Sequence, residues 1–206
     1  VGELLELVGL RPEHARRWLA LKNAQTRLGD GEGVMWARRQ AWFHYLAKSA
    51  IETAADLYVA FTPLQEEALM KQLAPAPFQL FSQSEGDLGA RMHNIFSALF
   101  AKEYKNVVLI GADLPPVPLD YFAQAYDYLD GPEPGVVLGP SRDGGYYLVG
   151  LNRPMPAMFE NMTWSHDQVF TQTMTKLADL RIETRQLPIW FDIDTRKYPG
   201  STAWKR

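Results

Sequence analysis

Cysteine is absent from the 206 residues of the sequence, and histidine occurs only four times. The absence of cysteine excludes a disulfide framework, thiolate zinc sites, iron–sulfur clusters and cysteine nucleophiles. The four histidines, at positions 14, 44, 93 and 166, are scattered without the spacing of metal ligands. A metal ion bound to this protein would therefore have oxygen ligands, as Mg²⁺ and Mn²⁺ prefer.

The sequence also lacks an excess of positive charge and a long hydrophobic run. Lysine and arginine number 21 and aspartate and glutamate 24, so the net charge is 21 − 24 = −3. A protein with this charge has no overall positive field to hold a nucleic acid backbone, and we expect no nucleic acid partner. No stretch reaches the roughly 18 consecutive apolar residues of a membrane helix, and the N-terminus does not resemble a signal peptide. We therefore expect a cytoplasmic protein with no membrane partner.

Three familiar motifs are missing as well. The sequence has neither the G-x-x-x-x-G-K-[ST] pattern of a P-loop nor the G-x-S-x-G pattern of a nucleophile elbow. The glycine-rich segment 29–33 is followed by valine, so it does not complete the G-x-G-x-x-G pattern of a Rossmann dinucleotide site.

What the sequence does contain is enough apolar material for one folded domain. Hydrophobic residues make up 47% of the chain, charged residues 22% and aromatic residues 12%, which is typical of a globular rather than a disordered protein. The length suits a single α/β domain. We expect one domain over residues 1–206, with a helical extension at 1–18 that offers a contact for a homodimer.

Apolar runs of strand length alternate with amphipathic segments of helix length along most of the chain. The patterns predict helices at 1–20, 34–54, 88–100, 119–129 and 167–180 and from residue 64, and strands at 57–61, 78–81, 107–110, 136–138, 146–149 and 182–187, with a strand stub at 19–21. Such alternation predicts a three-layer α/β/α sandwich with a mainly parallel sheet and right-handed crossovers. In sheets of this kind, ligands bind beyond the carboxyl ends of the strands.

Asp113 is the first candidate for a functional side chain. It follows the apolar strand predicted at 107–110, within Gly111-Ala112-Asp113-Leu114-Pro115. A carboxylate at the carboxyl end of a central strand can hold a divalent cation that bridges to the oxygens of a diphosphate. Asp113 can equally accept a backbone N–H and cap the turn before Pro115, and position alone does not separate the two interpretations.

The segment 83–92 is a second candidate, because Asp87 stands where the next helix begins. The simpler interpretation is an N-cap, in which the aspartate accepts backbone N–H groups of the first turn. In the functional interpretation, Gly86, Gly89 and the helix N-terminus face a nucleotide, and Arg91 contacts phosphate. Taken alone, the segment favours the N-cap.

Two glycines follow an aspartate in the loop between the strands predicted at 136–138 and 146–149. The Asp143-Gly144-Gly145 sequence permits a positive φ and a close approach to a ligand, but Asp-Gly is also an ordinary turn, and the turn of a hairpin is favoured. Trp164 follows in another loop. It could stack on a sugar or a base, although tryptophan is more often a core or rim residue.

Three further side chains have both a functional and a structural interpretation. Asp192 and Asp194 alternate with an isoleucine, so in an extended segment both carboxylates face one side. They could supply a second metal ligand or a ribose contact, or they could cap a helix. Arg27 precedes the glycine-rich segment and could be a phosphate clamp or a solvated surface residue.

The order of these motifs is more specific than any one of them. The motifs are Gln-Ser-Glu-Gly-Asp-Leu-Gly-Ala-Arg-Met at 83–92, Leu-Ile-Gly-Ala-Asp-Leu-Pro at 109–115, Leu-Gly-Pro-Ser-Arg-Asp-Gly-Gly-Tyr-Tyr-Leu-Val-Gly-Leu at 138–151, Trp-Ser at 164–165 and Asp-Ile-Asp-Thr at 192–195. Together they resemble a bacterial family of small proteins with the glycosyltransferase-A fold, described as nucleotide-diphospho-sugar transferases or uncharacterised glycosyltransferases. The resemblance covers about residues 24–195.

The resemblance implies roles for the candidate residues. Asp113 and Asp143 are the catalytic candidates, and Asp113 with Asp192 and Asp194 would hold Mg²⁺ or Mn²⁺. The residues that would bind the nucleotide or the other substrate are Arg27, Gln83, Gly86, Asp87, Gly89, Arg91, Gly144, Gly145, Trp164 and Ser165.

The N-terminal part departs from the family. The family has a Pro-Gly-containing loop followed by Lys-Thr-Arg-Leu, whereas here residues 21–24 run directly into Gln25-Thr26-Arg27-Leu28. Either the chain has lost part of this phosphate-binding loop, or a loop between about residues 23 and 24 is missing from the sequence.

Three functions are consistent with these motifs. The leading hypothesis is a metal-dependent glycosyltransferase that uses a nucleoside diphosphate sugar and an unknown small-molecule acceptor. The nearest alternative is a nucleotidyltransferase that takes a nucleoside triphosphate and releases pyrophosphate, since Gly-Ala-Asp-Leu-Pro and Asp-Ile-Asp-Thr suit that chemistry as well. The third is a catalytically inactive nucleotide-binding module, which the shortened loop makes conceivable.

Overall fold

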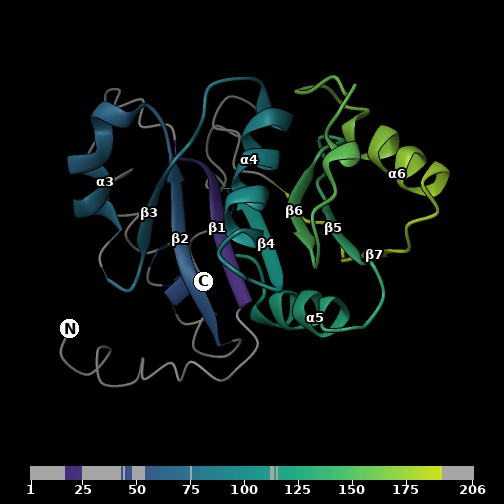
Figure 1. The fold of residues 1–206 in the computed structure, drawn as a ribbon, viewed down its shortest axis with the longest axis horizontal. Helices are drawn as coiled ribbons and strands as arrows, with labels where there is room; N and C mark the ends of the chain where they lie inside the picture. The colour runs from purple at the N-terminus through teal and green to yellow at the C-terminus, as the bar shows by residue number, and fades with distance from the viewer. Residues whose placement is uncertain are drawn as a thin grey trace.

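The computed structural model describes residues 17–24, 43, 45–47, 54–74, 76–111, 114 and 116–191 of the chain. Within these residues the strands form one seven-stranded sheet in the order β3-β2-β1-β4-β6-β5-β7 (Figure 1). The elements are β1 (Arg17–Ala24), β2 (Ala55–Phe61), η1 (Leu64–Glu66), α3 (Glu67–Leu73), β3 (Gln79–Ser82), α4 (Leu88–Phe100), β4 (Asn106–Gly111), α5 (Leu119–Leu129), β5 (Val136–Pro140), β6 (Tyr146–Leu151), η2 (Pro156–Met158), α6 (Val169–Asp179) and β7 (Thr184–Gln186).

The sheet is mainly parallel, as predicted, with β6 as the antiparallel strand. The pairs β1·β2, β1·β4, β2·β3 and β5·β7 are parallel, whereas β6 pairs antiparallel with both β4 and β5. The reason is the short connection between β5 and β6. Only residues 141–145 join the two strands, and a parallel crossover needs about a dozen residues or more.

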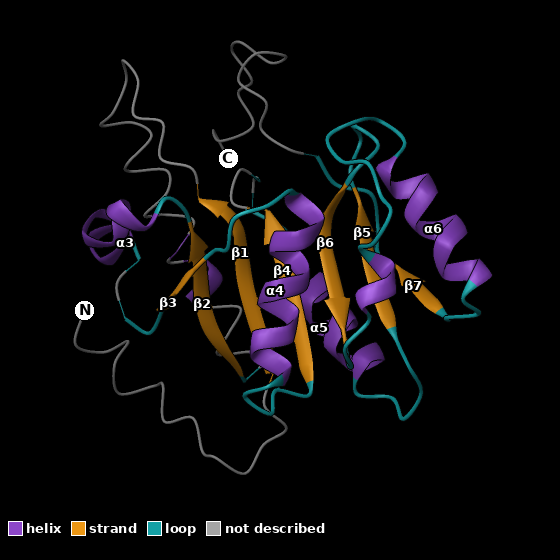
Figure 2. Ribbon diagram, turned by 45° about the horizontal axis from the view of Figure 1, so that its top comes forward, coloured by secondary structure: helices purple, strands orange, loops and turns teal. Residues whose placement is uncertain are grey.

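Helices cover both faces of the sheet, which confirms the three-layer α/β/α sandwich (Figure 2). Successive residues of β2 point to opposite faces, as the pleat of a strand requires. Leu57, Val59 and Phe61 pack in a core with α3 and α5, and Tyr58 and Ala60 pack in a second core with α4 and α6. In Figure 2, α4 and α6 lie in front of the sheet and α5 lies behind it.

Most predicted elements are confirmed, and their bounds shift by a few residues. The helix predicted at 119–129 coincides with α5, and the helix predicted at 88–100 coincides with α4. Residues 17–20, predicted as the end of a helix, are instead strand, so that part of the prediction is wrong and the strand stub at 19–21 is confirmed as the middle of β1. Residues 1–16, which include most of the predicted extension and its dimer contact, lie outside the described residues.

Strand β1 is irregular near the position where the sequence departs from the family. Leu21 pairs with Val59 and Ala24 pairs with Phe61, so three residues of β1 run beside two residues of β2. The register shift is a bulge-like irregularity, and bulges are common beside ligand sites. In the described part of the chain, no helix is both long and apolar enough to cross a membrane.

Candidate functional site

The strand order reverses between β1 and β4. From β1 the chain continues to β2 and β3 on one side, and then returns to form β4 on the other side of β1. In open α/β sheets, ligands bind in the crevice beyond the carboxyl ends of the strands at such a reversal. Here that point lies beyond Ala24 at the end of β1 and Gly111 at the end of β4. Gly111 pairs with Lys22, two residues before Ala24.

Four of the predicted site residues lie outside the described residues: Arg27, Asp113, Asp192 and Asp194. Their roles stay predictions. The described residues stop at Gly111 before Asp113 and resume at Leu114 after it, and the last described residue, Phe191, immediately precedes Asp192. The other predicted residues, from Gln83 to Ser165, are all described.

The described candidate segments meet at one edge of the sheet. Segment 83–91 follows the end of β3, and loop 141–145 follows the end of β5. Since β6 is antiparallel, it begins at the edge where β4 and β5 end, with Leu148 opposite both Ile110 and Gly139. Helix α6 also begins there, because the Phe170 N–H donates to the Gly144 carbonyl at 2.9 Å. We call this the carboxyl edge.

Gln83 is anchored at the end of β2. Its backbone N–H donates to the Phe61 carbonyl at 2.9 Å, and its side-chain Nε2 donates to the Ala60 carbonyl at 2.8 Å. The residue is only 9% exposed, and its Oε1 has no hydrogen-bond partner among the described residues. Gln83 therefore fastens segment 83–91 to the sheet and keeps one acceptor oxygen unused.

The N-cap interpretation of Asp87 is confirmed. Its Oδ1 accepts the Ala90 N–H at 2.8 Å at the start of α4. Arg91 turns back toward the same turn, and its Nε donates to the Gly86 carbonyl at 2.9 Å. The polar groups of this turn therefore satisfy one another, and the Arg91 guanidinium keeps its terminal nitrogens for other contacts.

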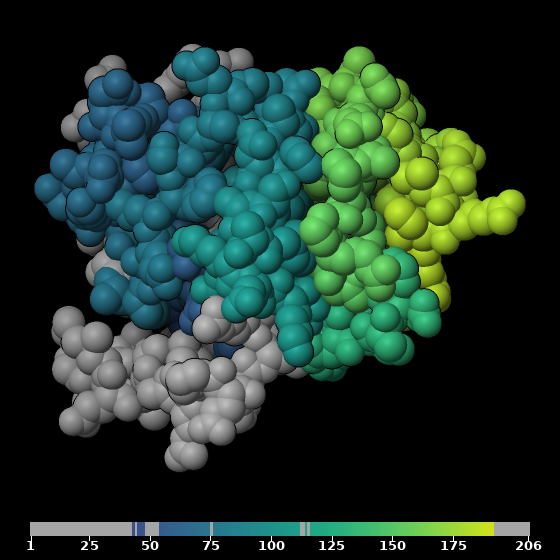
Figure 3. Space-filling model, in the orientation of Figure 1, coloured from purple at the N-terminus to yellow at the C-terminus, as the bar shows by residue number. Residues whose placement is uncertain are grey.

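Gly89 leaves the space that the Trp164 ring occupies. A Cβ atom at position 89 would lie 2.5 Å from the indole Nε1, so any other residue would displace the ring. The contact joins the first turn of α4 to the loop before α6, and Figure 3 shows these two regions abutting on one face of the molecule. The indole Nε1 is buried and has no hydrogen-bond partner in the described part of the chain.

Loop 141–145 is the turn of a β-hairpin, as predicted. The Asp143 Oδ1 accepts the Gly145 N–H at 3.1 Å, and the Gly144 N–H donates to the Ser141 carbonyl at 3.1 Å. Gly144 has a φ of +89°, and a Cβ there would lie 1.9 Å from the Asp167 carbonyl oxygen. The close approach that the double glycine permits is thus made to the segment before α6.

His166 organises that segment. Its Nδ1 accepts the Gln168 N–H at 3.1 Å, and its Nε2 lies 2.8 Å from the Thr163 Oγ1 and 3.1 Å from the Thr163 carbonyl. The ring therefore closes a turn over residues 163–168. Ser165 lies in this turn with a φ of +67°, an exposed position beside Trp164.

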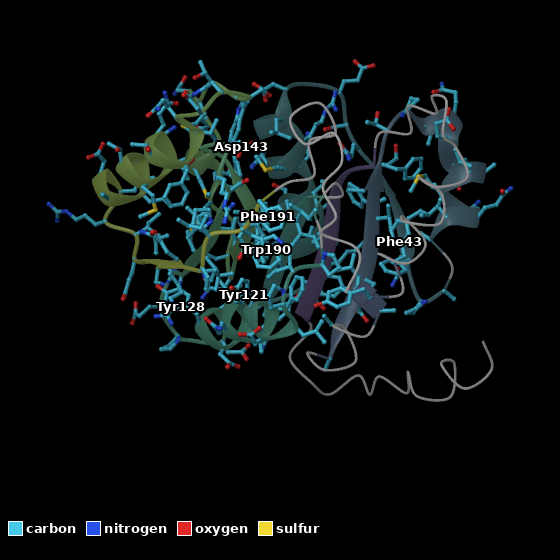
Figure 4. The ribbon with its side chains drawn as sticks, turned by 180° about the vertical axis from the view of Figure 1, so that it is seen from behind. Phe43, Tyr121, Tyr128, Asp143, Trp190 and Phe191 are labelled. Carbon is cyan, nitrogen blue, oxygen red and sulfur yellow. The ribbon has the colours of Figure 1, made fainter. Side chains whose placement is uncertain are left out.

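Four residues at the carboxyl edge were not among the predicted site residues. The Trp190 ring stacks on Phe191, with centroids 5.2 Å apart, and meets Tyr121 of α5 edge-on at 5.9 Å. The guanidinium of Arg142 lies over the Phe191 ring at 5.5 Å. Figure 4 shows Phe191, Trp190 and Tyr121 following one another from the carboxyl edge toward α5. We call the three aromatic residues, Tyr121, Trp190 and Phe191, the aromatic stack.

The sequence contains a signal for this stack, namely two adjacent aromatic residues immediately before Asp192. Their partner on α5 is about 70 residues away along the chain, and no local pattern reveals that contact. Tyr147 extends the same region, because its hydroxyl donates to the Pro188 carbonyl at 3.2 Å. Burial raises the pKa of Tyr147 above its usual value, so this phenol is a hydrogen-bond donor rather than a base.

Carboxylates close to the edge do not form a complete metal site within the described residues. No group of three or more His, Cys, Asp or Glu side chains in that part of the chain could hold a metal ion. The predicted ligands Asp113, Asp192 and Asp194 lie outside the described residues.

Comparison with solved structures defines the fold class. The chain resembles a provisionally assigned nucleotide-diphospho-sugar transferase from Desulfovibrio desulfuricans G20, with a TM-score of 0.73, 25% identity, and coverage of 93% of this chain and 90% of that one. A 4-diphosphocytidyl-2C-methyl-D-erythritol synthase from Anaerococcus prevotii DSM 20548 has a TM-score of 0.57 at 9% identity, covering 85% and 90% of the two chains. These similarities place the chain in the glycosyltransferase-A-like fold of sugar and nucleotidyl transferases.

A third similar structure, from Mycobacterium tuberculosis H37Rv, was solved as a complex with manganese; its TM-score is 0.52 at 15% identity, with coverage of 89% of this chain and 96% of that one. Residues 45–166 match the family described as an uncharacterized protein conserved in bacteria, DUF2064. The chain belongs to this family. No curated protein matches the sequence.

Proposed function

We propose that the protein is a metal-dependent transferase that binds a nucleoside diphosphate sugar and passes the glycosyl group to a small-molecule acceptor. The observation that carries this proposal is the meeting of segment 83–91, loop 141–145 and the turn at 163–168 at the carboxyl edge, beside the reversal of strand order. The similarity to the Desulfovibrio protein along 93% of the chain supports the sugar-transferase reaction over other uses of the fold.

In this proposal Asp113, Asp192 and Asp194 hold the divalent cation. Carboxylate oxygens are the ligands that Mg²⁺ and Mn²⁺ prefer, and a chain without cysteine offers no competing thiolates. When bound, the cation would neutralise the diphosphate as it departs. The manganese complex of the Mycobacterium protein is consistent with such a site in this fold.

The nucleotide would lie in the crevice beyond β1 and β4. Gln83 has an unused acceptor oxygen at its rim, Arg27 would contact the diphosphate, and Arg91 has guanidinium nitrogens to spare. Asp143 would face the sugar and the acceptor from the other side, with its loop held by Gly144 and Gly145. Trp164 and Ser165 would lie beside the donor at the turn before α6.

A nucleotidyltransferase is the second candidate, and one observation favours it. The Anaerococcus synthase, whose named product carries a diphosphocytidyl group, shares the fold over 85% of this chain. A nucleotidyltransferase joins a nucleotide to its acceptor, whereas a glycosyltransferase passes a sugar from a nucleotide to its acceptor. The two candidates use the same crevice and differ in the phosphorus-containing product.

A product assay separates the candidates. The purified protein would be incubated with a panel of nucleotide sugars and nucleoside triphosphates, with phosphorylated and hydroxylated acceptors and with Mg²⁺ or Mn²⁺, and the products identified by mass. Free nucleoside diphosphate supports glycosyl transfer, and pyrophosphate supports nucleotidyl transfer. Binding without turnover for every acceptor would support an inactive nucleotide-binding module and contradict both enzymes.

Asp113→Asn tests the metal site. We expect it to abolish the divalent-dependent part of nucleotide binding, measured by calorimetry with and without Mn²⁺, because an amide is a far weaker ligand than a carboxylate. Asp179→Asn is the matched control, because Asp179 is an exposed aspartate at the far end of α6. Unchanged affinity and unchanged metal dependence in Asp113→Asn would contradict the assignment.

A further inference from the structure

Arg142 is an exposed cation whose charge no carboxylate neutralises in the described part of the chain. Its neighbour Asp143 does not pair with it, since the Asp143 Oδ1 accepts the Gly145 N–H instead. The guanidinium lies over the face of the Phe191 ring, with its Cζ 5.5 Å from the ring centroid. Arg142 is therefore positioned by an aromatic ring and still has its hydrogen-bond donors available.

The ring beneath Arg142 is firmly held. Phe191 stacks on Trp190 at an interplanar angle of 28°, and Trp190 packs edge-on against Tyr121 at 85°. The backbone of Trp190 is bound on both sides, because its N–H donates to the Pro140 carbonyl at 3.0 Å and its carbonyl accepts the Arg142 N–H at 3.1 Å. Both the backbone and the side chain of Arg142 are thus attached to the same segment.

The guanidinium of Arg142 carries five N–H donors in a planar fork, and its contact with the face of the Phe191 ring pairs none of them with an acceptor. The fork matches the two oxygens of a carboxylate or phosphate and binds them with paired hydrogen bonds. Because the Arg142 side chain is already held on Phe191, less conformational entropy is lost when an anion binds. The arrangement therefore suits recognition of an anionic group.

Two buried polar atoms lie on the same bridge between residues 141 and 190. Ser141 is 8% exposed, and neither its Oγ nor the Trp190 Nε1 has a hydrogen-bond partner among the described residues. Buried polar groups in folded proteins are usually paired, and an exception calls for an explanation. The Trp190 indole N–H is a donor and the Ser141 hydroxyl can donate as well as accept, so this bridge holds two further groups that can donate to an anion.

The position of Arg142 assigns the anion to one end of the substrates. The loop follows β5, and β6 lies between β5 and β4. At about 4.8 Å per strand, β5 lies roughly 10 Å from β4, on the side away from β1. A nucleotide bound in the crevice between β1 and β4 would lie away from Arg142. The acceptor, which would enter from the β5 side, would be the substrate that contacts Arg142.

We infer that Arg142, positioned by the aromatic stack, binds a phosphate or carboxylate group carried by the acceptor. The assignment of this anionic group to the acceptor rests on the proposed function. Anion binding by Arg142 can be measured without any turnover. Arg142 is a binding residue in this account, and Phe191 is a positioning residue that acts through it.

The test is an NMR titration of the full chain with inorganic phosphate and, separately, with acetate. The signals followed are the backbone amides of residues 141–145 and the indole N–H of Trp190. We expect saturable shifts, and the anion that binds more tightly identifies the group on the acceptor. Arg142→Gln should raise the dissociation constant about tenfold or more, because hydrogen bonds to charged groups are lost. Arg142→Lys should recover part of the affinity, because it keeps the charge without the fork.

Two further variants complete the test. Phe191→Leu should raise the dissociation constant about threefold by removing the cation–π contact while leaving Arg142 in place. Arg153→Gln is the matched control, because Arg153 is an exposed arginine just after β6, at the opposite edge of the sheet, and its removal should change nothing. Unaltered amide signals far from the loop would show that each variant is folded.

Several outcomes would overturn the inference: shifts that do not saturate with either anion, equal affinity in wild type and Arg142→Gln, or an equal loss in Arg153→Gln. Its failure differs from failure of the proposed function. If the product assay detects transfer and Arg142→Gln keeps the wild-type KM for the acceptor, only this inference fails. If anions bind through Arg142 and no nucleotide or sugar transfer occurs, only the proposed function fails.

Discussion

Replacing Gly144 with alanine should destabilise the protein strongly, although the side chain added is a single methyl group. Gly144 has a φ of +89°, where an L-residue is strained by about 1–2 kcal/mol. Its Cβ would lie 1.9 Å from the Asp167 carbonyl oxygen, which is 3.4 − 1.9 = 1.5 Å inside ordinary contact. Relief of that clash moves the segment away and weakens the hydrogen bond from Phe170 to Gly144, worth about 1 kcal/mol.

The expected loss of unfolding free energy is about 3 kcal/mol. For a chain of this length, 1 kcal/mol corresponds to about 2–4 °C, so the Tm should fall by about 6–12 °C. Circular dichroism during heating and urea titration would measure both quantities. Gly145→Ala is the matched control, because its Cβ would lie 3.4 Å from the Asp143 Oδ1 and its φ is not positive. We expect it to change the Tm by about 2 °C or less.

The comparison of the two variants distinguishes a structural glycine from one kept for a ligand. A Gly144→Ala protein as stable as Gly145→Ala would refute the contact with Asp167 and would leave close approach to a ligand as the reason for the double glycine. A large loss of stability in Gly144→Ala alone would show that the glycine is required for the close contact with the Asp167 backbone.

Three other predictions follow from local contacts. Asp87→Ala should lower the unfolding free energy by about 1 kcal/mol in a urea titration, since it removes the N-cap of α4, whereas Asp87→Asn should restore most of it. Gly89→Ala should lower it by about 1–3 kcal/mol and change tryptophan fluorescence, because the Cβ overlaps the Trp164 indole; unaltered fluorescence would count against that contact. Burial raises the pKa of Tyr146 above its usual value of 10.0, so the unfolded chain loses this proton at a lower pH than the folded chain does. The unfolding free energy should therefore fall as the pH rises above 10, by about 1.4 kcal/mol per pH unit for this group. The fall should be less steep in Tyr146→Phe.

The layers and most elements of this fold could be predicted because they depend on local periodicity. The face of α5 repeats apolar residues at helical spacing, and the predicted bounds 119–129 are those observed. The apolar run 107–110 is completely buried in β4, as a central strand requires. The helix predicted up to residue 20 is wrong at its end, because pairing of β1 with both β2 and β4 decides the conformation of residues 17–20.

The site was less predictable, because its contacts join residues far apart in the chain. Asp87 could be placed as an N-cap from its position alone, and the hydrogen bond to Ala90 confirms that interpretation. By contrast, no local pattern shows that Gly89 makes room for Trp164 or that Gly144 makes room for the Asp167 backbone. Both glycines were predicted to contact a ligand. The structure shows a protein partner for each, and their role toward a ligand stays a prediction.

The proposed function makes the carboxyl edge the place where nucleotide and cation bind together. The most direct measurement is hydrogen exchange of the full chain with each of four nucleoside diphosphates, ADP, GDP, CDP and UDP, with and without Mn²⁺. We predict that at least one of them, with Mn²⁺ present, slows exchange in segments 83–91 and 141–145 and leaves the opposite edge, at 101–105 and 152–155, unchanged. Slower exchange confined to that opposite edge, or no change with any nucleotide and Mn²⁺, would contradict the account.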